Sequence, residues 1–369
     1  MQQAANLPDD YGSEGKGEVM RFFHTADIHL GASPDAGFPW GARRKEEIWE
    51  SFRRLIARAK EEKPELLLIA GDLFHRQPLL RELKEVNYLF STIAETKVVL
   101  IAGNHDYWKH GSFYEGFHWC PNVACLGGAD CQKVVFPEFH TAVYGLSYHS
   151  REIREPLYDG LRPEKDGMFS ILLAHGGDER HIPMDRRRML ASGFDYIALG
   201  HIHKPQILEK DRMAYAGALE PLDKNDCGPH GFLAGEYEKG KIKISFVPWA
   251  ARDYRILEID TDEGDTDFSL EEKISRRIRE SGRENIYRIH MTGFRDPDIV
   301  FQTERYRRLG NVVEILDDTE PAYDFDGLRE THEEDVIGCF IRRLYRPGMD
   351  EVTKKALAYG VQALLEVRS

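Results

Sequence analysis

The sequence predicts a mixed α/β fold in which two sheets pack face to face with flanking helices. Five short apolar runs, at 20–23, 66–69, 98–101, 170–173 and 196–199, are typical of buried strands. Segments with helical spacing alternate with the first of these runs. Residues 123–148 and 205–250 instead hold short apolar segments separated by glycine and proline, which is typical of short strands joined by turns.

Two helices are predicted in the first part of the chain. Residues 43–63 place apolar side chains at helical spacing, and Pro64 ends the segment. Pro78 opens a second helix that continues to about Thr96 with the same kind of apolar stripe. The aromatic-rich stretch 107–119 follows the third apolar run, and its side chains favour core or dimer packing over base stacking.

The composition changes after Tyr254. Strands at 255–259, 286–291 and 312–316 alternate with helices at 269–280 and 303–309, which predicts a small β-α-β-α-β domain. The acidic stretch 317–334 is typical of a linker, and two helices are predicted at 335–345 and 350–367. The apolar stripe of the last helix either belongs to a core or docks a partner.

Composition limits the function classes. The chain has 369 residues and a formal net charge of −13, which is unusual for a sequence-independent DNA binder. DNA affinity would have to come from local basic faces, such as 43–45, 186–188 and 305–308, or from a partner; solvated helix faces explain the same clusters. No apolar run approaches the ~18 residues of a membrane span.

Location and redox state are also predicted. Residues 1–18 are polar, lack the apolar region of a signal peptide, and are expected to be a disordered tail. The five cysteines are sparse, which favours a cytoplasmic location, and Cys120, Cys125 and Cys131 lack the spacing of a zinc site.

Each apolar run is followed directly by candidate metal ligands. These are Asp27 and His29, Gly71-Asp72, Gly103-Asn104 with His105 and Asp106, His175, and Gly200-His201 with His203. Because ligands bind at the carboxyl ends of strands in open α/β folds, we expect these side chains to converge. Oxygen and imidazole ligands in such number suit two divalent metal ions and phosphoester hydrolysis.

Three residues are candidates for catalytic roles. His105 is the expected general acid, and Asp106 is expected to hold the His105 ring in one tautomer. His75 either faces the substrate or has a hydrogen-bonded role in its loop, and His24 is interpreted as structural.

With these residues, the chain resembles the calcineurin-like metallophosphoesterase superfamily. Thr25-Ala-Asp27-Ile-His29-Leu-Gly31, Ala70-Gly-Asp72-Leu-Phe-His75 and Gly228-Pro-His-Gly231-Phe resemble its SbcD/YhaO branch of DNA repair nucleases. The resemblance implies a four-layer α/β/β/α sandwich over 19–253 and a small α+β capping domain over 254–320. It also implies, over 321–369, a linker and C-terminal helical segment that could dock an ATPase partner.

The resemblance further implies a division of the ligands. One metal would be held by Asp27, His29, Asp72 and His203, and the other by Asp72, Asn104, His175 and His201. The implied ions are two Mn²⁺, although imidazoles also suit zinc or iron.

The implied activity is that of a manganese-dependent exonuclease and single-strand endonuclease. It would act in DNA repair as a homodimer with an SMC-like ATPase of the SbcC/YhaN type, away from any membrane. A two-metal phosphodiesterase for a small nucleotide and a non-catalytic scaffold for the ATPase remain the alternatives.

Overall fold

A computed structural model describes residues 19–367, so the predicted tail over 1–18 lies outside the described residues. The chain divides into two compact units. The first runs to Leu222 and includes Pro229–Ala251, whereas the second comprises Asp223–Gly228 and the chain from Arg252 onward. The segment Asp223–Gly228 belongs to the second unit because the backbone of Cys227 pairs with that of Tyr254 in an isolated β-bridge, and because Lys224 forms an ion pair with Glu314.

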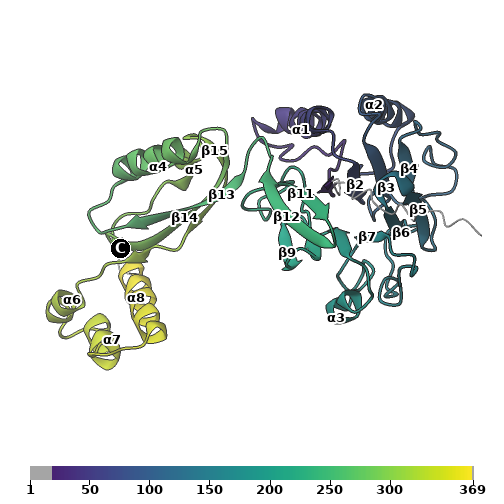
Figure 1. Cartoon of the computed structure of the whole chain (residues 1–369). Helices are drawn as coiled ribbons and strands as arrows, with labels where there is room; N and C mark the ends of the chain where they lie inside the picture. Colours follow the sequence, from purple (N-terminus) through teal and green to yellow (C-terminus); the bar gives the residue numbers. More distant parts are fainter. Residues whose placement is uncertain (1–18, 368–369) are drawn as a thin grey trace, which may run out of the picture. The chain divides into compact units, whose positions relative to one another are not determined.

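The first sheet of the first unit has the strand order β12-β11-β1-β2-β3-β4. Strands β1 (Met20–Thr25), β2 (Leu66–Ala70), β3 (Lys97–Ile101) and β4 (Val123–Cys125) are parallel. Strands β11 (Gly231–Glu238) and β12 (Lys241–Pro248) extend the sheet as an antiparallel hairpin beside β1. Helices α1 (Gly41–Glu62) and α2 (Leu80–Ser91) lie along the same side of this sheet (Figure 1).

The second sheet has the order β5-β6-β7-β8-β10-β9. Its strands are β5 (Gln132–Phe136), β6 (Thr141–Gly145), β7 (Phe169–His175), β8 (Tyr196–Gly200), β9 (Gln206–Glu209) and β10 (Met213–Tyr215), and the short 3₁₀ helix η1 (Pro137–Phe139) joins β5 to β6. Strands β6, β7, β8 and β10 are parallel.

Side-chain alternation along the strands builds three cores. Leu67 and Ile69 of β2 face α1 and α2, whereas Leu66 and Leu68 face the second sheet. Leu172 of β7 faces the opposite way, into a third core with α3 (Arg186–Leu190). Successive strand residues point to opposite faces, so each buried strand contributes to two cores. On the outer side of the second sheet, α3 and irregular chain cover this third core.

The second unit has a parallel sheet of β13 (Tyr254–Thr261), β14 (Ile286–Arg295) and β15 (Asn311–Asp317), and β16 (Glu320–Pro321) pairs with β14. Helices α4 (Asp267–Ser281) and α5 (Thr303–Tyr306) pack on one face of it (Figure 1). Thr266 caps α4 with its hydroxyl.

Three helices follow, and they have a core of their own. They are α6 (Phe325–Thr331), α7 (Val336–Leu344) and α8 (Glu351–Glu366), packed around Ile337, Ile341, Leu357 and Val361. The stretch 317–334 is therefore not a plain linker, because it contains β16 and α6. Its aromatic residues Tyr323 and Phe325 pack against the helical core, and the acidic composition hid that role.

The prediction of a mixed α/β fold with several sheets and C-terminal helices is confirmed. All five apolar runs are strands, and the helix predicted over 78–96 is shorter, at Leu80–Ser91. The aromatic stretch 107–119 contributes buried Tyr114 and the packed rings of Trp108, Phe117 and Trp119 to the first core. Within 19–367, no helix combines the length and apolar character needed to cross a membrane.

Candidate metal centre

The candidate ligands follow strands of both sheets, and the structure brings them together at one edge. Hydrogen bonds join the two sheets there: the His175 ring contacts the Ala70 carbonyl at 2.8 Å, and the backbone N–H of His201 donates to Asp27 Oδ2 at 2.8 Å. All seven predicted ligand residues come together here. Six of them form two adjoining groups of three, and Asp72 lies between the groups; the seven are Asp27, His29, Asp72, Asn104, His175, His201 and His203.

The first group contains Asp27, His29 and His203. The Nε2 atoms of His29 and His203 lie 3.2 Å apart, and Asp27 Oδ1 lies 3.9 Å from the former. Asp27 Oδ1 is buried and has no hydrogen-bond donor among the described residues. A buried carboxylate oxygen without a donor, facing two imidazole nitrogens, fits a bound cation.

The second group contains Asn104, His175 and His201. Asn104 Oδ1 lies 3.0 Å from His175 Nε2 and 3.2 Å from His201 Nδ1. His175 Nδ1 contacts the Ala70 carbonyl, so it carries a proton, and Nε2 is the nitrogen that can bind a cation once its own proton is displaced. One amide oxygen and two imidazole nitrogens again suit a divalent cation.

Asp72 connects the two groups. Its Oδ2 atom lies 3.8 Å from His29 Nε2 and 3.4 Å from His175 Nε2, whereas Oδ1 accepts the backbone N–H of His105 at 2.9 Å. A single carboxylate oxygen therefore faces both groups, as a bridging ligand requires.

The backbone of this edge is strained. Asp27, His29, Asp72 and His201 all have positive φ, at 49°, 51°, 50° and 96°. Such conformations cost about 1–3 kcal/mol each and persist where the surroundings impose them. Gly71, at φ 90°, has room for no side chain, because a Cβ there would lie 2.3 Å from His175 Nδ1.

Burial and the neighbouring charges set the protonation of the site. Burial raises the pKa of Asp27 to about 6, and burial lowers the pKa of His29 well below its ordinary value. Burial alone would lower the pKa of His175, but the Asp72 carboxylate raises it to about 9. Burial would raise the pKa of Asp72, yet His175, His29 and His105 together lower it. The protein without metal thus carries a protonated His175 against a charged Asp72.

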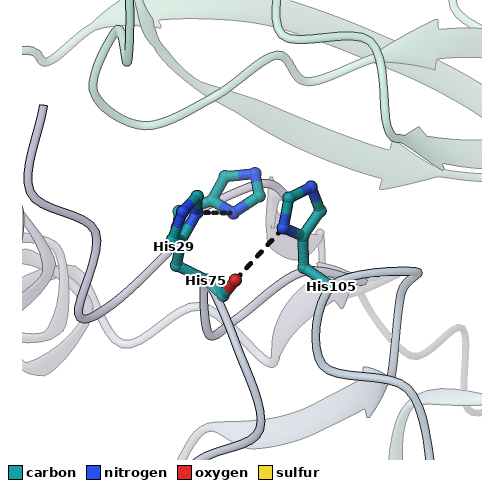
Figure 2. Close-up of side chains that lie close together, drawn as sticks. All are labelled: His29, His75 and His105. Atoms are coloured by element: carbon teal, nitrogen blue, oxygen red, sulfur yellow. Dashed lines mark hydrogen bonds between the residues drawn. The ribbon is translucent and has the colours of Figure 1, made fainter. Parts of the chain in front are cut away.

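His105 lies beside the first group with one ring nitrogen unengaged by the backbone. Figure 2 shows its Nδ1 atom directed at the His75 carbonyl oxygen, 3.1 Å away, with Nε2 on the far side of the ring. Nδ1–H donates to the carbonyl, so Nε2 is the atom that can give a proton to a substrate.

The His75 side chain forms a hydrogen bond with the ring of His29. Their Nδ1 atoms lie 3.4 Å apart, and the His75 ring stacks on His105 with centroids 5.1 Å apart (Figure 2). Of the two roles considered from the sequence, this contact supports the hydrogen-bonded one, since it would hold His29 Nε2 towards the first group.

Asp106 requires a correction. It was expected to hold the His105 ring, but its Oδ1 accepts from the Gly103 N–H at 2.8 Å, and its Oδ2 accepts from the Phe74 N–H and the Tyr114 hydroxyl, each at 3.1 Å. Asp106 therefore joins the loops after β2 and β3, and the His75 carbonyl orients the His105 ring instead. Neighbours in sequence need not face each other at a turn.

Asp178 and His181 also lie at this site, although no sequence pattern pointed to them. His201 Nε2 lies 2.7 Å from Asp178 Oδ2, and His181 Nδ1 lies 2.8 Å from the same oxygen. These residues follow His175 after two glycines, in a loop without a recognisable motif. His24, interpreted as structural, is buried with Nδ1 2.9 Å from the Tyr196 hydroxyl, and all five cysteines are free thiols.

Comparison with known proteins agrees with this geometry. Residues 20–205 match the family model described as calcineurin-like phosphoesterase. The chain belongs to this family. It is similar to the "Uncharacterized metallophosphoesterase YhaO" of Bacillus subtilis, with 32% identity over 248 residues, covering 62% of this chain and 60% of YhaO.

Archaeal relatives carry a more specific name. The "DNA double-strand break repair protein Mre11" of Methanocaldococcus jannaschii is 30% identical over 246 residues, covering 62% of this chain and 65% of the relative. Its namesake in Methanopyrus kandleri is 25% identical over 355 residues, covering 84% of this chain and 75% of the relative. The match thus spans less than two thirds of the first two relatives. This calcineurin-like phosphoesterase is therefore similar to proteins named for DNA double-strand break repair, and it has candidate His/Asp metal clusters.

Proposed function

We propose that this protein is a two-metal phosphodiesterase that hydrolyses DNA as an exonuclease and single-strand endonuclease. The observation that carries the proposal is Asp72 Oδ2, which faces both ligand groups, with His105 beside them. The similarity to proteins named for DNA double-strand break repair supports DNA as the substrate.

Asp27, His29, Asp72 and His203 would hold one divalent cation, and Asp72, Asn104, His175 and His201 the other. When bound, such a pair supplies positive charge that polarises a phosphodiester and makes water more acidic. We propose Mn²⁺, since the set combines carboxylate and amide oxygens with imidazoles.

His105 would protonate the leaving sugar oxygen from Nε2. Its Nδ1–H stays on the His75 carbonyl, so the ring returns to one neutral tautomer after the transfer. The stacked His75 ring limits rotation of His105. Asp106 holds the loop that carries Asn104 and His105, through the Gly103 N–H.

One experiment separates DNA from small substrates. The purified chain with Mn²⁺ is incubated with single-stranded DNA, linear duplex DNA or bis(p-nitrophenyl) phosphate, with EDTA as the blank. Cleavage of DNA at lower substrate concentration than the chromogenic diester supports the proposal. The net charge of −13 favours the rival, a phosphodiesterase for small nucleotides. Rapid turnover of the diester while the DNA stays intact would establish the small-nucleotide phosphodiesterase. If the metal-loaded protein turns over none of these substrates, the remaining alternative is a non-catalytic scaffold for the ATPase.

We further propose that α8 docks an SMC-like ATPase of the SbcC/YhaN type. Val352 and Tyr359 of α8 are 79% and 61% exposed, whereas Leu357 and Val361 face the helical core. Residues i and i+7 share a helix face, so the two exposed side chains form an apolar stripe suited to a groove. Replacing both with serine should abolish co-purification with the ATPase and leave nuclease activity intact.

Self-association is proposed through the region 78–118. Tyr88 and Phe113 in this region are 68% and 53% exposed, so both rings are available to contact a second copy of the chain. Sedimentation of the parent should show a dimer, and Tyr88→Glu with Phe113→Glu should shift it to a monomer. A parent that sediments as a monomer at micromolar concentration would exclude this dimer.

A further inference from the structure

A turn beside the second ligand group places the carboxylate of Asp178 against the ring of His201. The turn is Gly177–His181, closed by the Gly177 N–H donating to the His181 carbonyl at 2.8 Å. Asp178 Oδ2 lies 2.7 Å from Nε2 of His201, whose Nδ1 lies 3.2 Å from Asn104. His201 thus has one nitrogen towards the metal group and the other on Asp178.

The turn is held firmly in place. The hydroxyls of Tyr148 and Tyr215 donate to the carbonyls of His175 and Gly176 at 3.1 and 3.0 Å. At the other end, Ile182 is fully buried with φ 40°, and its N–H donates to the Ile153 carbonyl at 2.7 Å. A β-branched residue at positive φ is rare and requires surroundings that impose it.

The Asp178 carboxylate is itself oriented from several sides. Oδ1 accepts the backbone N–H groups of Arg180 and His181 at 2.8 and 3.0 Å, and the His181 ring contacts both oxygens. These donors leave Oδ2 directed at His201. A carboxylate has only acceptors, so the His201 atom that faces it must be Nε2–H.

We propose that Asp178 is a positioning residue that holds His201 as the Nε2–H tautomer, with the Nδ1 lone pair available to a cation in the second group. This inference rests on the proposed function, in which His201 is a ligand. Partners of this kind behind a metal-binding imidazole typically change metal affinity by roughly 10–100-fold.

Asp178→Asn is the decisive variant because it keeps size and the turn acceptor. An amide nitrogen placed at Oδ2 would donate to Nε2 and move the His201 proton to Nδ1, where it obstructs the cation. Asp185→Asn is the matched control: Asp185 accepts the N–H groups of Arg187 and Arg188 at the start of α3, as Asp178 does for Arg180 and His181 in its turn. Asp178→Glu tests partial rescue by a charged acceptor.

Two measurements test the inference. Calorimetric titration of the full chain with Mn²⁺ should show two ions for the parent and Asp185→Asn. For Asp178→Asn, one ion should bind roughly 10–100-fold more weakly while the other is unchanged, and Asp178→Glu should recover part of the loss. Thermal unfolding in EDTA establishes that each variant is folded. In metal-free protein, ¹H–¹⁵N correlation of the imidazoles should show His201 protonated at Nε2 in the parent and at Nδ1 in Asp178→Asn.

The outcomes are distinct from those for the proposed function. Parent-like binding of both ions by Asp178→Asn, or an Nδ1–H tautomer in the parent, overturns the positioning role alone. A third ion bound by the parent and lost in Asp178→Asn also overturns it, because Asp178 would then be a ligand. If the parent binds fewer than two ions, the two-metal centre fails, and the tautomer measurement still decides the role of Asp178.

Discussion

Asp72 Oδ2 lies 3.4 Å from His175 Nε2, and the same oxygen lies 3.8 Å from a histidine of the other ligand group. The second oxygen of Asp72 is occupied by the backbone N–H of His105. The carboxylate is therefore held on one side by the chain and directed by its other oxygen at the space where cations would bind.

Asp72→Asn should weaken both metal sites together. The amide oxygen can keep the contact with the His105 N–H, but the shared negative charge is lost. We expect both Mn²⁺ affinities to fall by more than the roughly 10–100-fold that is typical of an outer partner, as measured by equilibrium dialysis. Asp195→Asn is the control, since Asp195 accepts from Ser170 at the opposite end of β7. Loss of only one ion would show that Asp72 does not bridge.

His105→Ala should separate leaving groups. A general acid contributes about 10²–10⁴-fold when the leaving oxygen needs a proton, so cleavage of DNA should fall by that factor. The p-nitrophenolate of the chromogenic diester leaves without a proton, so its hydrolysis should fall much less. Binding of Mn²⁺ should be unchanged in titration. Equal losses for the two substrates would exclude His105 as the proton donor.

Metal uptake should release protons in a pH-dependent way. The pKa of His175 is raised to about 9 in the metal-free protein, and a cation must displace that proton. Affinity for the second ion should therefore increase as pH rises towards 9 and level off above it. Burial raises the pKa of Asp27 to about 6, so near pH 6 a bound cation should also displace a proton from this carboxyl group. Calorimetry in two buffers of different ionisation enthalpy counts these protons, and a count that does not vary from pH 6 to pH 9.5 would contradict this assignment.

Gly71→Ala should damage the site beyond its effect on the backbone. Both Gly71 and Gly240 have positive φ, at 90° and 79°, but a Cβ at Gly240 would meet open space whereas one at Gly71 would meet the His175 ring. Each alanine should cost about 1–2 kcal/mol of unfolding free energy from the left-handed backbone alone. We expect only Gly71→Ala to lose Mn²⁺ binding as well, as followed by urea unfolding in EDTA and metal titration. Equal metal binding by the two variants would show that His175 can move away.

Periodicity and spacing were sufficient for much of this protein. Short, mostly apolar runs identify β1, β2, β3, β7 and β8, because a strand buried on both faces is made largely of apolar residues. The residues directly after these strands are the candidate ligands, since the carboxyl ends of parallel strands share an edge. The partners of Asp106 and the α6 helix within 317–334 were not predicted. The hydrogen bonds of Asp106 reach Phe74 and Tyr114, which no local pattern indicates. The α6 helix was not recognised because the acidic composition of its segment is typical of a linker.

Local pattern and residue chemistry were enough to predict the five apolar strands, the types of ligand and the order of the ligands along the chain. The fold was needed to show which oxygen of Asp72 faces both groups, that the His75 carbonyl orients His105, and that Asp178 lies behind His201. Those relationships depend on side-chain direction at strained turns and on two sheets meeting at one edge. A difference of one turn residue would redirect such side chains without changing the periodicity of the strands.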